Sequence, residues 1–167
     1  MKAQRNTRRN TRYIVRAAII AAIYATVAYF SAPLQFANFQ FRLSEALCIL
    51  PIFMPEASVG LFLGAILANY LTGCVLWDIV FGSIATLLGA LGASLLSKLP
   101  DKLLWLSTLP TVISNAVIVP FVIIYAYGST DAYWFLFFTV AVGEIVTAGI
   151  LGSALLYYLK QRKLFFR

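Results

Sequence analysis

Residues 39–71 read FQFRLSEALCILPIFMPEASVGLFLGAILANYL. An arginine and a glutamate, Arg42 and Glu45, stand three residues apart at the start of an otherwise apolar run. Pro51 and Pro55 then divide the run, because proline has no backbone N–H to donate and restricts the residue before it. The stretch therefore predicts a short helix, a sharp reversal and a second helix, with a charge pair at the entrance.

The composition of the whole chain requires lipid as the solvent around most of it. Of the 167 residues, 62% are hydrophobic and 11% are charged, and there is no histidine. Soluble domains are roughly 45–50% apolar and about 25% charged. The sequence therefore predicts an all-α integral membrane protein.

Six transmembrane helices can be placed along the chain. A helix needs about 20 apolar residues to cross a bilayer upright, so the second segment is too short to do so alone. The six predicted segments are 13–31, 43–54, 56–71, 78–97, 106–127 and 132–161. They form one domain, 13–161, between a basic N-terminal tail, 1–12, and a basic C-terminal tail, 162–167.

The basic residues predict the orientation of this bundle. Lys and Arg collect in cytoplasmic segments, so both basic tails are expected in the cytoplasm, which requires an even number of crossings. The connection between the fourth and fifth segments is then also cytoplasmic, and it carries Lys98 and Lys102. Arg42 is left as the one basic residue outside. The basic residues flank membrane spans rather than forming a basic domain, so we expect no nucleic-acid partner.

The first segment carries two stripes of small residues. Ala17, Ala21 and Ala25 form one stripe at four-residue spacing, and Ala18 and Ala22 form a second beside it. Such stripes let helix backbones approach closely in lipid. Packing inside the bundle explains one stripe, whereas a double stripe is wider than one neighbour needs. One face is therefore a candidate for docking a partner protein.

Polar and aromatic residues within the spans are the candidates for substrate binding, because charges at helix centres cost about 2.5–3.5 kcal/mol and usually serve a function. Glu144 is the deepest, twelve residues or about 18 Å from the outer end of its helix. The predicted binding residues are Arg42, Glu45, Asn69, Trp77, Asp78, Asn115, Tyr133, Phe137 and Glu144.

Structural roles remain open for several of these residues. Glu144 and Asn115 have similar depths and could pair simply to hold two helices together. Asp78 lies at a helix start, where an acidic side chain offsets the helix dipole. Arg42 and Glu45 could neutralise each other at the membrane interface.

The motifs of several enzyme classes are missing. There is no GxxxxGK[ST] loop for ATP hydrolysis, and no GxSxG or HExxH sequence. Cys48 and Cys74 have no histidine to complete a zinc site, and we expect both to be free thiols. The sequence predicts no enzyme, metal or cofactor. The sequence favours a secondary transporter or the substrate-binding subunit of a larger transport complex.

Two stretches of the sequence resemble the queuosine-precursor (QueT-type) family of S-components in energy-coupling factor (ECF) transporters. The similarity covers about a third of the chain, in FRLSEALCILPIFMPEASVGLFLGAILANYLTG and WDIVFGSIATLLGAL. The matching positions are Gln40, Arg42, Ser44, Glu45, Ala46, Leu47, Pro51, Pro55, Gly60, Gly64, Ala68, Asn69, Asp78, Gly82 and Thr86.

This resemblance implies a six-helix S-component bundle in the plasma membrane of a prokaryote. It implies capture of a 7-deazaguanine, such as preQ1, preQ0 or queuine, from outside the cell. It also implies two kinds of partner, an ECF T-component and two cytoplasmic ABC ATPases, with the alanine face of the first helix as the docking surface. Which of Glu45, Asp78 and Glu144 contacts which ligand group stays open.

Two other functions stay open at this point. A proton- or ion-coupled secondary transporter would use Glu144 and Asp78 as its titrating pair. A small structural or pore-forming membrane protein would use the same polar residues only to hold helices together.

Overall fold

The computed structural model describes residues 2–35 and 40–162, with the backbone alone for residues 2–9. All secondary structure in these residues is helical. The elements are α1 (Lys2–Phe30), α2 (Ala32–Gln35), η1 (Leu43–Ile52), α3 (Ala57–Leu71), α4 (Leu76–Leu95), η2 (Leu96–Lys98), η3 (Asp101–Thr108), α5 (Leu109–Tyr127), α6 (Tyr133–Glu144), η4 (Ile145–Leu151) and α7 (Gly152–Gln161). Four continuous helical stretches are long and apolar enough to cross a membrane, as expected for a multi-pass membrane protein.

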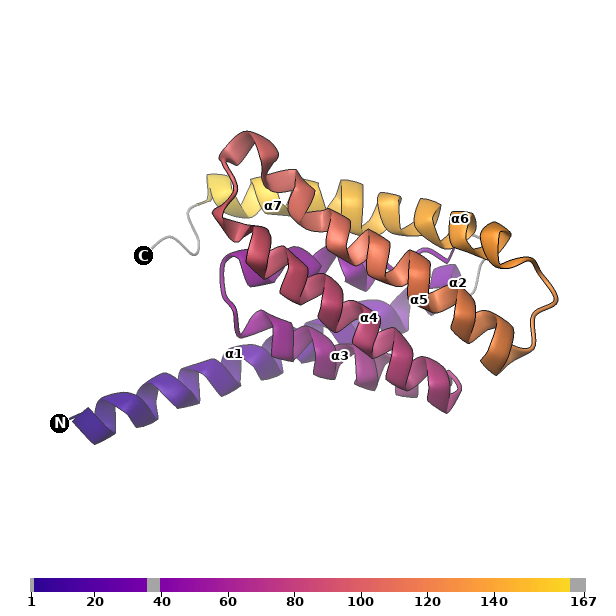
Figure 1. Ribbon diagram of the computed structural model, residues 1–167. Helices are drawn as coiled ribbons and strands as arrows, with labels where there is room; N and C mark the ends of the chain where they lie inside the picture. Colours follow the sequence, from indigo (N-terminus) through magenta and orange to yellow (C-terminus); the bar gives the residue numbers. More distant parts are fainter. Residues whose placement is uncertain (1, 36–39, 163–167) are drawn as a thin grey trace.

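The helices run side by side along one long axis (Figure 1). The start of α1, the end of α7 and the connection from α4 to α5 lie at one end of the bundle, called here the terminus end. The α3–α4 turn, the α5–α6 connection and α2 lie at the other end, called here the opposite end.

Most helix boundaries fall close to their predicted positions, and three features differ. Helix α1 begins at Lys2 rather than at residue 13, so its helical backbone continues into the basic tail. Element η1 is a 3₁₀ helix, with Pro51 near its end. The last segment changes from α-helix to π-helix at residues 145–151 and then returns to α-helix.

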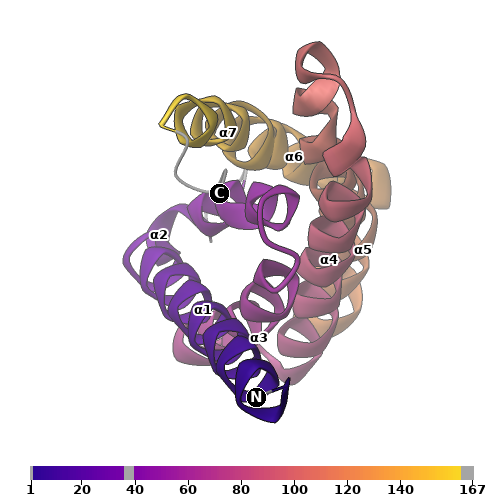
Figure 2. The same cartoon turned by 90° about the vertical axis from the view of Figure 1, so that its left-hand side faces the viewer.

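Element η1 lies inside the bundle and contacts α1, α4, η4 and α7 (Figure 2). Its side chains Glu45, Cys48 and Ile49 are buried. A short helix surrounded by other helices does not need the length of a lipid-exposed span. The charge pair at its start is therefore carried into the protein interior and away from lipid.

Helices α1 and α3 pack through the small residues noted in the sequence. A Cβ atom added to Gly60 would lie 2.6 Å from the backbone oxygen of Ala17, and one added to Gly64 would lie 3.0 Å from the Cα of Ala21. Glycine is required at both positions because the two backbones are this close. The stripe containing Ala17 and Ala21 is thus covered by α3.

This contact narrows the predicted docking face of α1. Ala17 and Ala25 are buried within the chain, and Ala21 is partly buried. Ala18 and Ala22 are exposed on the adjacent face of the helix. The assignment of all five alanines to an external partner was too broad, because one stripe serves internal packing.

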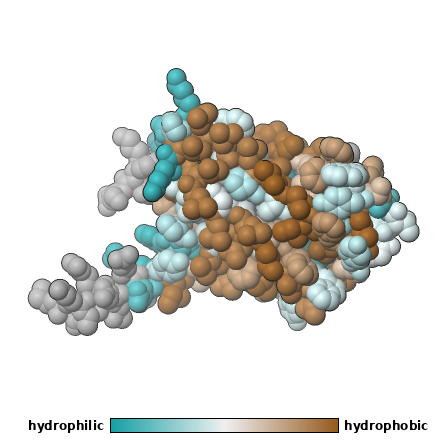
Figure 3. Space-filling model, in the orientation of Figure 1, coloured by the Kyte–Doolittle hydropathy of each residue, from teal (hydrophilic) through white to brown (hydrophobic). Residues whose placement is uncertain are grey.

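The outer surface is mainly apolar along the middle of the bundle (Figure 3). Hydrophilic residues gather at the terminus end in the same view. Among the described residues, two ion pairs are present, Arg16 with Glu56 at 2.9 Å and Lys160 with Asp101. The surface has the pattern of a protein whose middle zone is solvated by hydrocarbon chains.

Candidate functional site

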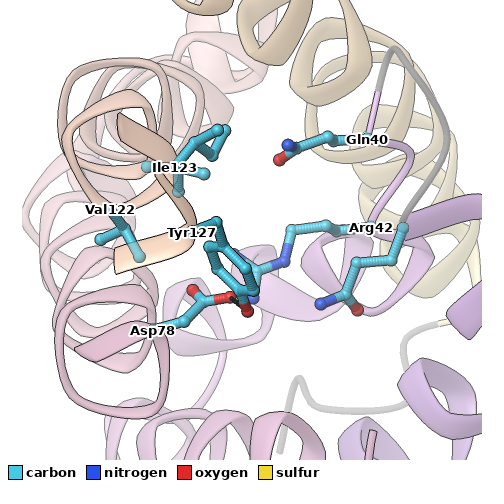
Figure 4. A pocket seen from close by; sticks show the side chains of 8 residues that line it. Gln40, Arg42, Asp78, Val122, Ile123 and Tyr127 are labelled. Carbon is cyan, nitrogen blue, oxygen red and sulfur yellow. Dashed lines mark hydrogen bonds between the residues drawn. The ribbon is translucent and has the colours of Figure 1, made fainter. Parts of the chain in front are cut away.

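A polar cavity of about 130 Å³ opens at the opposite end of the bundle. Its lining comes from α2, the segment before η1, the first turn of α4 and the last turns of α5. The lining residues are Gln35, Gln40, Arg42, Asp78, Val119, Val122, Ile123 and Tyr127. Figure 4 shows Gln40 and Arg42 reaching in from one side, with Asp78 and Tyr127 on the other. A charged base and a charged acid thus face a small cavity with apolar walls.

Arg42 is held in place by α3. Its side chain is only 5% exposed, and it donates a hydrogen bond of 2.9 Å from its guanidinium to Oδ1 of Asn69. Asn69 in turn donates from Nδ2 to the backbone oxygen of Asp78 at 3.2 Å. Burial alone would lower the pKa of Arg42, but the nearby acidic side chains Asp78, Glu45 and Glu144 raise it overall. The guanidinium is therefore a fixed positive charge at the cavity wall.

Asp78 is held by α5. The hydroxyl of Tyr127 donates to Oδ2 of Asp78 at 3.0 Å, while Oδ1 is buried and has no hydrogen-bond partner among the described residues. The side chain of Asp78 does not cap α4, whose N-cap residue is Val75. One oxygen of this carboxylate is thus free to accept from a ligand.

Gly82 makes this cluster possible. A Cβ atom at this position would lie 2.8 Å from Oδ1 of Asp78, 3.1 Å from Nδ2 of Asn69 and 3.6 Å from the guanidinium of Arg42. The three polar side chains meet over the bare backbone of α4. A glycine in a membrane helix usually serves helix packing, and here it makes room for a polar group.

Gln40 lines the cavity from an unusual backbone conformation. Its φ angle is +46°, in the left-handed region that non-glycine residues rarely adopt. Such strain is found most often at functional sites. Gln35 and Gln40 both contribute to the cavity wall. Residues 36–39 between them lie outside the described residues.

Glu45 belongs to a second polar cluster, which does not include Arg42. Its Oε1 accepts hydrogen bonds from the hydroxyls of Tyr24 at 2.5 Å and Thr86 at 2.7 Å. Its Oε2 accepts from the thiol of Cys48 at 3.1 Å. Glu45 is fully buried and makes no ion pair with Arg42. The interpretation that these two residues only neutralise each other at the interface is therefore wrong.

Glu144 and Asn115 are also fully buried, but they do not pair with each other. Asn115 donates to the backbone oxygen of Thr111 at 3.2 Å, within its own helix. Oδ1 of Asn115 and both carboxylate oxygens of Glu144 have no hydrogen-bond partner among the described residues. Neither residue lines the polar cavity. The interpretation that they hold α5 and α6 together by a mutual hydrogen bond is wrong.

The predicted aromatic residues lie away from the polar cavity. Trp77 is 60% exposed, and it stacks on Phe81 beside an apolar groove between α4 and α5. Tyr133 donates to the backbone oxygen of Val117, and its ring contacts those of Phe121 and Phe137. In this structure Trp77, Tyr133 and Phe137 are surface or inter-helix residues, and the aromatic side chain in the cavity is Tyr127.

Both cysteines are free and buried, as predicted. Cys74 lies in the turn between α3 and α4, where burial raises the pKa of its thiol. A raised pKa leaves little thiolate at neutral pH, so this cysteine is a poor nucleophile. No group of three His, Cys, Asp or Glu side chains suited to a metal ion occurs in the part of the chain that the structure describes.

Comparison with known proteins gives one match. Neither the curated proteins nor the solved structures give a match to this chain. A family model described as QueT transporter matches residues 14–161, from within α1 to the end of α7. The matched region contains every side chain of the polar cavity. The chain belongs to the QueT transporter family.

Proposed function

We propose that this protein is the substrate-binding membrane subunit, or S-component, of an ECF-type importer that captures a 7-deazaguanine from outside the cell. The observation that carries the proposal is the cavity in which Arg42 and Asp78 face each other at the end of the bundle opposite both termini. The basic tails favour the cytoplasm at the terminus end, so the cavity opens toward the outside. In this arrangement the four long helices and the two shorter ones, η1 and α3, make six crossings.

The hydrogen-bonding groups of the cavity suit the edge of a guanine-like ring. Such an edge presents N–H donors beside a carbonyl oxygen. Oδ1 of Asp78 is an acceptor without a partner, while Arg42 and the amides of Gln35 and Gln40 supply donors. Val119, Val122 and Ile123 offer apolar contacts to a flat ring. One ligand can therefore engage both charged walls of the cavity.

The volume of the cavity favours a small ligand. Pockets for drug-sized molecules measure about 300–1,000 Å³, whereas this cavity measures about 130 Å³. A bicyclic heterocycle would fill it.

ATP-driven uptake by this subunit would require partners, because the sequence contains no ATP-hydrolysing motif. We propose that an ECF T-component docks on the exposed face of α1 that contains Ala18 and Ala22, and that two cytoplasmic ATPases drive uptake. The small side chains on this face allow close approach of a second helix in the membrane.

The experiment that tests the proposed function is calorimetry of the detergent-purified chain with preQ1, queuine and guanine. We expect binding of the 7-deazaguanines, with affinity in the submicromolar range of about −8 kcal/mol or better. Absence of binding by every 7-deazaguanine tested would overturn the proposal. Uptake of such a ligand into liposomes that contain this chain alone, driven by a pH gradient, would instead support a secondary transporter.

Replacement of Tyr127 by phenylalanine should weaken ligand binding about fivefold, because loss of one hydrogen bond costs about 1 kcal/mol. The phenol holds Oδ2 of Asp78, and its removal leaves the carboxylate free to rotate away from the ligand. Titration of the purified variant measures the effect. Tyr125→Phe is the matched control, since Tyr125 is 82% exposed and outside the polar cavity. Equal affinities of the two variants would contradict this role of Tyr127.

A further inference from the structure

The N-terminal part of α1 continues as a helix beyond the rest of the bundle. The element is unbroken from Lys2 to Phe30, and its first turns extend past the other helices at the terminus end (Figure 1). Residues 10–16 are all exposed. The apolar part of the helix begins near Tyr13, so Lys2 lies about 17 Å farther along the axis at 1.5 Å per residue. This extension is therefore a surface that the bundle leaves uncovered.

The basic residues of the extension share one face of the helix. Successive residues of an α-helix are rotated by about 100°. By this rotation, all basic residues between positions 2 and 16 fall within about 120° of the circumference, and no other residue of that segment falls there. They are called here the basic face and comprise Lys2, Arg5, Arg8, Arg9, Arg12 and Arg16. Membrane orientation depends on the number of basic residues and not on their helical period, so orientation alone does not explain this face.

The rest of the extension is polar but uncharged. Up to position 11, the residues outside the basic face are Ala, Gln, Asn and Thr. A helix that inserts sideways into the membrane surface needs a broad apolar face, and residues 2–12 have none. Any attraction of this segment to a membrane is therefore electrostatic.

Farther along α1, the line of the basic face becomes a lipid-exposed face. The helical period leads from Arg16 to Ile19 and Ile23, and both isoleucines are exposed. The stripe that packs on α3 and the exposed stripe of Ala18 and Ala22 lie on the remaining two sides of the helix, each roughly a third of a turn away. The basic face is thus continuous with the side of α1 that hydrocarbon chains solvate.

The basic face meets little acidic charge within the chain. Arg16, at its inner end, donates to Oε1 of Glu56 at 2.9 Å and is still 58% exposed. Arg12 is exposed and makes no ion pair with a described residue. The face therefore has positive charge in excess of what its own chain neutralises.

We propose that the basic face lies against anionic phospholipid headgroups of the inner leaflet, and that α1 leans toward this face where it leaves the hydrocarbon core. Headgroups add about 5–7 Å to each side of that core, and attraction between exposed charges extends roughly 8 Å farther at physiological salt. A lean keeps the outermost basic residues within this range, whereas an upright helix would carry them toward its limit. The inference depends on the predicted orientation and not on the ligand.

Hydrogen exchange of the backbone amides of residues 2–12 tests the inference, because contact with headgroups would oppose fraying of a helix end. The full chain is placed in nanodiscs of phosphatidylglycerol, which is anionic, or of phosphatidylcholine, which is zwitterionic. We expect exchange to be at least about tenfold slower in phosphatidylglycerol. The difference should disappear at about 1 M salt, where the screening length falls to about 3 Å.

A register variant is the matched control. Arg5→Asn, Asn6→Arg, Arg9→Asn and Asn10→Arg together keep the composition and net charge of the chain. They spread the basic residues over about 200° of the helix. We expect the slowing by phosphatidylglycerol to fall to about threefold or less in this variant. Exchange in α3 and α4, followed in the same experiment, shows whether the bundle is folded.

Three results would overturn the inference. Equal exchange of the unmodified chain in the two membranes would exclude selection of anionic lipid, whatever the variant does. Equal slowing in the unmodified chain and a folded register variant would show that net charge matters and the basic face does not. Equal exchange in both membranes, followed by slowing on addition of polyglutamate or single-stranded RNA, would assign the face to a soluble acidic partner.

Discussion

Replacement of Arg42 by glutamine is expected to weaken binding of a 7-deazaguanine about 100-fold, because loss of a buried, hydrogen-bonded charge costs about 2–5 kcal/mol. Arg42 is the cation of the cavity wall, and its guanidinium is fixed by Asn69. Glutamine keeps a polar side chain but lacks the charge and the reach of the guanidinium. Asp78 and Glu45 would then lose their nearest compensating cation.

The control for this variant is Arg16→Gln. It removes the same charge from the same chain, but at a side chain that is 58% exposed and pairs with Glu56 away from the cavity. Calorimetry of both proteins in one detergent measures the difference, and a thermal unfolding scan of each shows whether the fold survives. Ligand affinity within about threefold of the unmodified chain in a folded Arg42→Gln protein would contradict the role of Arg42.

The sequence predicted the helical segments because hydrophobic length and proline position are local signals. Pro51 and Pro55 marked the reversal between η1 and α3, and the structure has it there. The 3₁₀ geometry of η1 and the π-helical turns of η4 were not predicted. Both depend on how neighbouring helices pack around the segment, and a single sequence does not carry that information.

The polar part of the site was predicted better than its aromatic part. Arg42 and Asp78 could be found because charges are expensive in a membrane and therefore stand out. Tyr127 was missed, since an aromatic residue at a helix end is also typical of the membrane interface. Tyr133 and Phe137 were predicted to bind the ligand, but periodicity does not determine whether their side of the helix turns toward the cavity or toward α5.

The two alanine stripes of α1 also show that residue spacing alone does not determine which face of a helix packs inside the protein. Their spacing indicated close helix packing, and the contact of Gly60 with Ala17 confirms it for one stripe. Which stripe is internal could not be decided from spacing, because both have the same period. The structure separates them by burial, so the two stripes can now be tested separately.

Replacement of Ala18 and Ala22 together by leucine is expected to abolish ATP-driven uptake of the ligand while leaving binding by the purified chain unchanged. Both side chains are exposed on α1, so leucine fits in lipid without disturbing the bundle. The added bulk would keep a partner helix from the close approach that small residues allow. Uptake in cells that express the T-component and the two ATPases, with calorimetry of the isolated subunit, measures the two properties.

Two further variants separate docking from folding. Ala154→Leu adds the same bulk at an exposed alanine of α7 and should leave uptake unchanged. Ala17→Leu enlarges a buried residue that faces α3, where overpacking typically costs about 1–3 kcal/mol, and should lower the unfolding temperature. Normal uptake by the Ala18/Ala22 variant would remove the docking face from this side of α1. Loss of both uptake and binding would show that these alanines serve the fold, because a surface used only by the partner has no effect on the isolated subunit.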